Sequence, residues 1–207
     1  MAQLKNTRAR TQYLVKLAIL AAILFFLEVT GLGYIRIPFI SMTIMQVPVI
    51  IGAIVLGPAA GAVLGAVFGL TRFWQAVSGK DPVGSILLSQ NPFGLVVTTI
   101  PTRILMGWLC GVIYQALRRT RLHEYLRLIF ASLSGALLNT LLFMGMFILF
   151  FFRAPVVQDI ATSLGTDSPL RFAFLLVGVQ GLVEAGICAV LGSAVSRALI
   201  KYSKAST

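Results

Sequence analysis

The chain has 207 residues, of which 58% are hydrophobic and 11% are charged, and its mean hydropathy is +0.94. These values lie far outside the usual range of soluble globular domains, so the sequence predicts an integral membrane protein. The net charge of +11 would also fit a nucleic-acid-binding protein, but the basic residues lie where a membrane topology places them.

Apolar segments of about twenty residues recur along the whole chain, each long enough to cross a hydrocarbon core of about 30 Å as a helix. We predict an all-α integral membrane protein with six transmembrane helices, folded as one domain over residues 1–207. Cytoplasmic tails are expected at residues 1–11 and 202–207. The predicted spans are residues 12–33, 40–56, 58–77, 94–117, 125–152 and 169–200.

Basic residues gather in three clusters, which six spans would place on one side of the membrane. The clusters are Lys5, Arg8, Arg10 and Lys16; Arg118, Arg119, Arg121 and Arg127; and Arg197, Lys201 and Lys204. On the other side, acidic residues offset the basic ones. The positive-inside rule therefore places both termini in the cytoplasm. The basic excess is expected to contact anionic membrane lipids, and no nucleic-acid partner is expected.

A few polar residues remain inside the predicted spans, where a charge costs about 3 kcal/mol or more and usually marks a functional site. They are Glu28, Gln46, Arg72, Arg103, Asn139, Gln180 and Glu184. At about 1.5 Å per residue, Arg103, Asn139 and Glu184 lie at a similar mid-depth on three successive helices. Gln180 lies one turn nearer the outside, on the same helix face as Glu184. Together these four side chains predict a cavity that opens outward.

Other interpretations of these polar residues remain open. Arg103 and Glu184 could form a structural ion pair that joins two helices and binds nothing. Asn139 could form an interhelical hydrogen bond rather than contact a ligand. Glu28 and Arg72 lie toward the outer ends of their helices, so their long side chains could reach water or headgroups.

The outer connections are longer than the cytoplasmic ones and are long enough to fold over the mouth of a cavity. They comprise residues 31–41, 78–93 and 153–169. Candidate ligand contacts in or beside them are the aromatic residues Tyr34, Phe39, Trp74 and Phe93 and the polar residue Asn91. The alternative for the aromatic residues is the interfacial belt found in most membrane proteins.

Small residues recur at four-residue spacing in two predicted spans. In "GPAAGAVLGAVFG" they form a ladder of Gly57, Gly61, Gly65 and Gly69, and in the first span they are Ala18 and Ala22. Such faces let another backbone approach closely. We expect tight intramolecular packing for the glycine ladder, and the first span is the better candidate for a partner interface.

The sequence offers no catalytic constellation. Gly79 and Lys80 are followed by Asp81 without the upstream glycine of a phosphate-binding loop, so ATP hydrolysis by that route is excluded. The single histidine, His123, lies in the cytoplasmic basic loop, which is expected to be far from Arg103 and Glu184 at mid-depth in the membrane. We therefore expect no enzyme activity, no cofactor and no metal site. A self-sufficient secondary transporter remains an alternative, although clear inverted repeats are missing.

Four stretches carry a resemblance to a known family: "ISMTIMQVPVIIGAIVLGPAAGAVLGAVFGLTRF", "PTRILMGWLCGVIY", "GALLNTLLFMG" and "GLVEAGICAVL". Over nearly the whole chain, the sequence resembles the substrate-binding S component of an energy-coupling factor (ECF) vitamin transporter of the bacterial plasma membrane. The resemblance implies six helices and a vitamin site near the extracellular side, formed by helices four to six and the outer loops. It also implies a complex with a transmembrane coupling subunit, met by Ala18 and Ala22, and two cytosolic ATPase subunits that drive uptake.

Within that family, "PTRILMG", "NTLLFMG" and "VEA" are most similar to pantothenate-type members. This resemblance implies that Arg103 binds the vitamin carboxylate and that Asn139, Gln180 and Glu184 meet its hydroxyls and amide. Glu184 either contacts the vitamin or only orients Arg103. Arg72 departs from the expected small polar residue, and either adds anion affinity or lies at the rim. Folate, another acidic vitamin, is the nearest alternative substrate, and a purely structural subunit or an intramembrane enzyme are the other classes.

Overall fold

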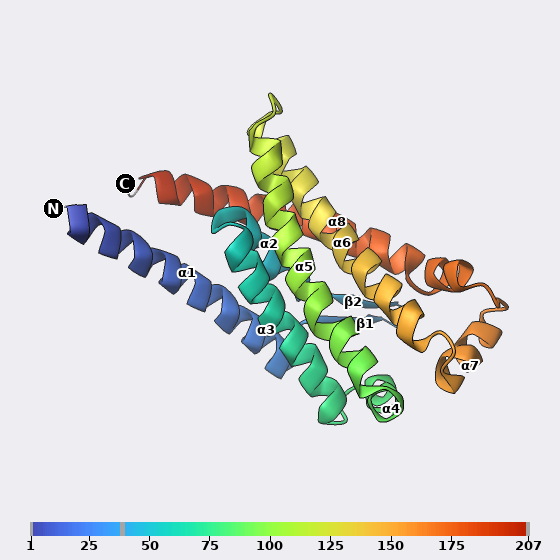
Figure 1. The fold of residues 1–207 in the computed structure, drawn as a ribbon. Helices are drawn as coiled ribbons and strands as arrows, with labels where there is room; N and C mark the ends of the chain where they lie inside the picture. Colours follow the sequence, from blue (N-terminus) through green and yellow to red (C-terminus); the bar gives the residue numbers. More distant parts are fainter. Residues whose placement is uncertain (1, 38–39, 206–207) are drawn as a thin grey trace.

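The computed structural model describes the backbone of residues 2–37 and 40–205, and the side chains of residues 10–33, 43–178 and 180–202. The described residues form eight helices and one antiparallel hairpin (Figure 1). The elements are α1 (Ala2–Thr30), β1 (Tyr34–Ile37), β2 (Ile40–Thr43), α2 (Gln46–Val55), α3 (Pro58–Val77), α4 (Pro82–Gln90), α5 (Pro92–Arg118), α6 (Glu124–Phe151), α7 (Pro155–Ser163) and α8 (Pro169–Ala205).

The predicted all-helical membrane fold is confirmed. Within the described residues, five helical segments are long and apolar enough to cross a membrane, and α2 is a shorter apolar helix. The five segments are Arg10–Thr30, Pro58–Val77, Pro92–Arg118, Glu124–Phe151 and Gln180–Tyr202. The last of these belongs to α8, which continues without a break from Pro169.

The predicted span over residues 40–56 is wrong in its first part. Residues 40–43 form β2, which pairs with β1 in the register Tyr34↔Thr43 to Ile37↔Ile40. The helix that follows has ten residues, so at about 1.5 Å per residue it covers about half of the hydrocarbon core. Residues 40–43 pair with β1, and the Ile44 N–H donates to the Gly33 carbonyl oxygen at 2.9 Å, so this part of the chain does not bond as a helix.

Helix boundaries follow local sequence signals. Five helices begin with a proline, which has no N–H to leave unsatisfied in the first helical turn: Pro58, Pro82, Pro92, Pro155 and Pro169. Gly57 and Pro58 make the abrupt turn between α2 and α3. Gly57 has a φ of 103°, a value that favours glycine because it has no Cβ. Two of the predicted outer connections contain short helices, α4 and α7.

The start of α1 and the end of α8 lie on the same side of the bundle (Figure 1). That side also carries the α2–α3 turn and the α5–α6 connection, whereas α4 and α7 lie at the opposite end. This arrangement agrees with the predicted even number of crossings.

Helices α3 and α5 pack backbone against backbone. A Cβ added to Gly61 would overlap the carbonyl oxygen of Gly107, and one added to Gly65 would overlap that of Arg103. One added to Gly69 would come within 2.8 Å of the Thr99 carbonyl oxygen. The glycine ladder therefore serves intramolecular packing over these three positions.

Helix α1 contacts the bundle along one face only. Leu20 and Leu24 are buried in the main hydrophobic core. Ala18 and Ala22 are exposed, and neighbouring large apolar side chains such as Phe26 are exposed as well. The small-residue pair is therefore available on the outer face of α1.

We predict that Gly65→Ala lowers the stability of the purified protein by about 1–3 kcal/mol, because the new methyl group must push apart two helix backbones. Gly186→Ala on α8 is the matched control, since a Cβ there meets no atom within 4 Å. Thermal unfolding in detergent measures both variants. Equal melting temperatures would contradict the close α3–α5 contact.

Candidate functional site

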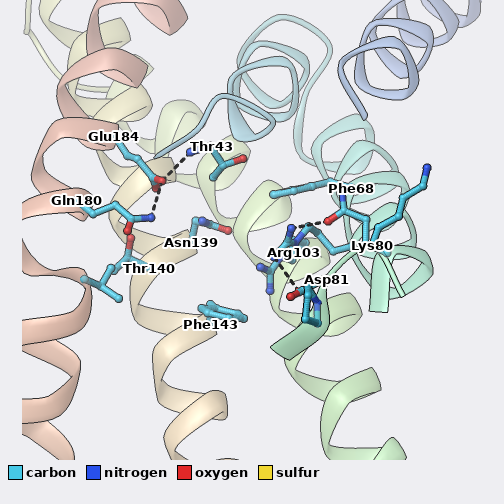
Figure 2. A pocket seen from close by; sticks show the side chains of 14 residues that line it. Thr43, Phe68, Lys80, Asp81, Arg103, Asn139, Thr140, Phe143, Gln180 and Glu184 are labelled. Atoms are coloured by element: carbon cyan, nitrogen blue, oxygen red, sulfur yellow. Dashed lines mark hydrogen bonds and ion pairs between the residues drawn. The ribbon is translucent and has the colours of Figure 1, made fainter. Parts of the chain in front are cut away.

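A cavity of about 430 Å³ lies among α3, α5, α6, α8 and the connection that follows α3. It brings together the four side chains that the sequence predicts to share a cavity: Arg103, Asn139, Gln180 and Glu184 (Figure 2). The structure therefore assembles the predicted polar group within a single cavity.

Arg103 on α5 is 5% exposed and is held from several sides. Its Nη1 donates to the Thr98 carbonyl oxygen at 2.7 Å and to the Thr102 hydroxyl at 3.1 Å. Its guanidinium lies 5.4 Å from the ring centroid of Phe68 and 4.5 Å from that of Phe143. Both separations are within the range of cation–π attraction. The charge is thus fixed in orientation at the cavity wall, as recognition of an anionic group requires.

Glu184 on α8 is 4% exposed and accepts hydrogen bonds from three elements. Its Oε1 accepts from the Thr43 backbone N–H at 2.8 Å and from Gln180 at 3.2 Å. Its Oε2 accepts from Gln46 at 3.4 Å. These bonds join α8 to the end of the hairpin and to the start of α2.

Glu184 and Arg103 lie on different sides of the cavity, with Asn139 between them in Figure 2. Charges of opposite sign attract across such a space, but the three hydrogen bonds described for Glu184 all go to neutral partners. The glutamate therefore has a structural role of its own, besides any effect on Arg103.

The two sides of the cavity differ in chemistry. On one side, Glu184, Gln180, Asn139 and Thr140 offer amide, hydroxyl and carboxylate groups. On the other, Arg103 is accompanied by Lys80 and Asp81 in Figure 2 and by Arg72 in the cavity lining. We call these the polar wall and the cationic wall. An elongated molecule with an acidic end and a hydroxyl- and amide-bearing body matches this division.

Arg72 on α3 lines the cavity and belongs to the cationic wall. Its Nη2 lies 3.6 Å from Oδ2 of Asp81, and its Nη1 donates to Gln75 Oε1 at 2.6 Å. Gln75 in turn donates to Glu28 on α1. The sequence held a signal for this position: Arg72 is four residues after Phe68 and seven after Gly65, so all three lie on the α3 face toward α5.

Several predicted site residues lie away from this cavity. Trp74 is 64% exposed and Phe93 is 69% exposed, as the aromatic-belt alternative expects. Asn91 caps α5, its Oδ1 accepting from the Gly94 N–H at 2.8 Å. Phe39 and the side chain of Tyr34 lie outside the described residues. Sequence reasoning also missed Thr43, Phe68 and Phe143, which line the cavity.

A second cavity of about 340 Å³ adjoins the first beneath α4 and shares part of its lining. The shared side chains include Arg72, Asp81, Arg103 and Phe143. Thr98, Thr99 and apolar groups such as Leu87 complete it. Both arginines of the cationic wall therefore face the same space.

A family model described as "ECF transporter, substrate-specific component" matches residues 12–196. The chain belongs to this family. It is a non-catalytic, multi-pass S component of the cell membrane that associates with an energy-coupling module.

Two curated relatives are similar to this S component over most of their length. "Pantothenate transporter PanT" of Leuconostoc mesenteroides is 30% identical over 202 residues, covering 94% of this chain and 95% of that protein. "Pantothenic acid transporter PanT" of Lactococcus lactis subsp. cremoris is 32% identical over 200 residues, covering 89% and 92%. The S component is thus homologous to proteins named for pantothenate transport.

We predict that Glu184→Ala destabilises the S component by about 1–3 kcal/mol, because the Thr43 N–H and the Gln46 and Gln180 amides lose a buried acceptor. Glu184→Gln keeps one acceptor oxygen and should have a smaller effect. Glu124→Ala, at an exposed glutamate in the first turn of α6, is the control. Thermal unfolding compares the three variants, and equal stability of Glu184→Ala and Glu124→Ala would contradict the hydrogen-bonding role.

Proposed function

We propose that this S component binds pantothenate from outside the cell for import. The observation that carries the proposal is the buried Arg103 guanidinium, held between Phe68 and Phe143 and facing the polar wall across the cavity. Pantothenate has one carboxylate, one amide and two hydroxyls. The names of the two relatives support the same substrate.

The carboxylate pairs with Arg103 in this proposal. A guanidinium bonds a carboxylate through charge-assisted hydrogen bonds, which are stronger than neutral ones. Since Arg103 is already oriented by Thr98 and the two rings, little side-chain freedom is lost on binding. Asn139 and Gln180 on the polar wall meet the amide and hydroxyls, and Glu184 accepts from a hydroxyl or holds Gln180 in place.

Delivery to the cytoplasm needs partners. We propose a complex with a transmembrane coupling subunit and two cytosolic ATPase subunits, whose ATP hydrolysis drives reorientation of the S component. The exposed small residues Ala18 and Ala22 are the proposed contact with the coupling subunit, because a partner helix can approach them closely. Membrane lipids surround the remaining apolar surface.

The substrate test is a binding titration of the purified chain with pantothenate and, separately, with folate. We expect pantothenate binding, and a loss of about 30-fold or more in Arg103→Ala, since a buried charge pair is worth about 2–5 kcal/mol. Arg171→Ala, at an exposed arginine of the same outer end, is the control. Unchanged pantothenate affinity in Arg103→Ala would show that Arg103 does not bind the ligand. Tight binding of folate alone would make folate the substrate in place of pantothenate. Binding of neither vitamin would refute the proposal.

The partner test enlarges the small residues of α1. Ala18→Leu and Ala22→Leu should reduce pantothenate uptake by the assembled transporter, because the larger side chains separate two helices. Pantothenate binding to the isolated chain should persist. Ala22→Ser, which keeps the residue small, is the matched control. Full uptake by both leucine variants would rule out this interface.

A further inference from the structure

The cationic wall contains an acidic residue at the place where an anionic ligand is attracted. Asp81 lies 3.6 Å from Arg72, and both side chains line the two cavities together with Arg103. Figure 2 shows Asp81 and Lys80 near Arg103 and away from Glu184. Asp81 therefore presents a carboxylate to the same group of cations that a carboxylate ligand would meet.

We propose that Arg72 is a second substrate-binding guanidinium and that Asp81 is its exchangeable internal counter-ion. On binding, the carboxylate of the ligand takes the place of Asp81 at Arg72. This proposal rests on the proposed function in one respect, namely that the ligand is pantothenate, a carboxylate.

The Arg72–Asp81 pair is suited to exchange. Its 3.6 Å separation exceeds the length of a good charge-assisted hydrogen bond, and the two side chains are 27% and 30% exposed. Ion pairs that water reaches contribute little to stability. Releasing Arg72 from Asp81 therefore has a small free-energy cost, which a carboxylate shared with the buried Arg103 can offset.

Both members of the pair keep other partners when they separate. Arg72 donates to Gln75 at 2.6 Å, and Gln75 donates to Glu28, so the guanidinium stays at the wall. Asp81 caps α4 through its other oxygen, which accepts from the Gly84 N–H at 3.2 Å. Exchange at Arg72 therefore leaves α3 anchored and α4 capped.

Asp81 is the carboxylate placed to compete with a ligand at the cationic wall. The carboxylates of Asp81 and Glu184 both line the cavity, but the oxygens of Glu184 accept from Thr43, Gln46 and Gln180. The Asp81 carboxylate lies 3.6 Å from Arg72 of the cationic wall. Removing its charge should make the cationic wall more attractive to a carboxylate.

The test is Asp81→Asn, because asparagine caps a helix about as well as aspartate but lacks the charge. Two ligands are titrated against the purified chain: pantothenate, and pantothenol, the alcohol in which CH₂OH replaces the carboxylate. We expect Asp81→Asn to bind pantothenate about two- to fivefold more tightly, the range of an exposed ion pair, and to bind pantothenol as the wild type does. Asp159→Asn on α7 removes an exposed carboxylate elsewhere and is the charge control.

A second arm measures Arg72 itself. Arg72→Gln should weaken pantothenate binding about tenfold. The gain in affinity from Asp81→Asn should vanish in the double variant, because without the Arg72 guanidinium there is no group for which Asp81 and the ligand compete. Arg72→Lys keeps a positive charge and should retain part of the affinity, which provides a measurement even where Arg72→Gln does not fold.

The outcomes separate the two proposals. If the wild type binds pantothenate but Asp81→Asn binds it no more tightly, the exchange is refuted while the proposed function stands. Equal tightening for both ligands, or a gain that persists without Arg72, would also refute it. If the wild type binds no pantothenate, the proposed function fails and the exchange fails with it.

Discussion

The backbone contact between α3 and α5 determines where the charges of the site lie. Gly65 meets the carbonyl of Arg103 directly, so any side chain larger than hydrogen there would move α5 away. Phe68 and Arg72 follow on the same face of α3, one and two turns further on. The contact therefore sets the Phe68 ring against the Arg103 guanidinium and places Arg72 at the same cavity. A stretch of glycines on α3 thus aligns the two arginines of the cationic wall.

Burial of the Arg103 charge within a membrane protein has a free-energy cost, and groups of its own helix and two aromatic rings offset part of it. A lone charge at the bilayer centre costs about 3 kcal/mol or more. The carbonyl of Thr98, the hydroxyl of Thr102 and the faces of Phe68 and Phe143 offset part of that cost. All four are neutral groups, which stabilise the guanidinium without cancelling its charge, so an incoming anion is attracted to it.

The sequence predicts those parts of the site that depend on depth within a helix. A polar residue in an apolar run is visible directly, and a constant rise per residue places Arg103, Asn139 and Glu184 at one level. Features that depend on tertiary pairing are harder to predict. Residues 40–43 directly precede the apolar helix α2 without a Gly or Pro between them, and their pairing with β1 makes them part of a hairpin instead. Asn91 is polar and lies in an outer connection, yet its side chain accepts from the Gly94 backbone N–H at the start of α5.

Helix α1 is attached to the cationic wall at its outer end, and this attachment bears on how binding and transport are linked. Glu28 accepts from Gln75, which accepts from Arg72, so α1 shares a chain of polar contacts with the cavity. The same helix presents Ala18 and Ala22 outward. A ligand shifts the equilibrium between two positions of α1 only if its interaction free energy with the protein differs between them. Any such difference must act through groups that touch both the cavity and α1, and Gln75 is one of them, because it lines the cavity and bonds Glu28.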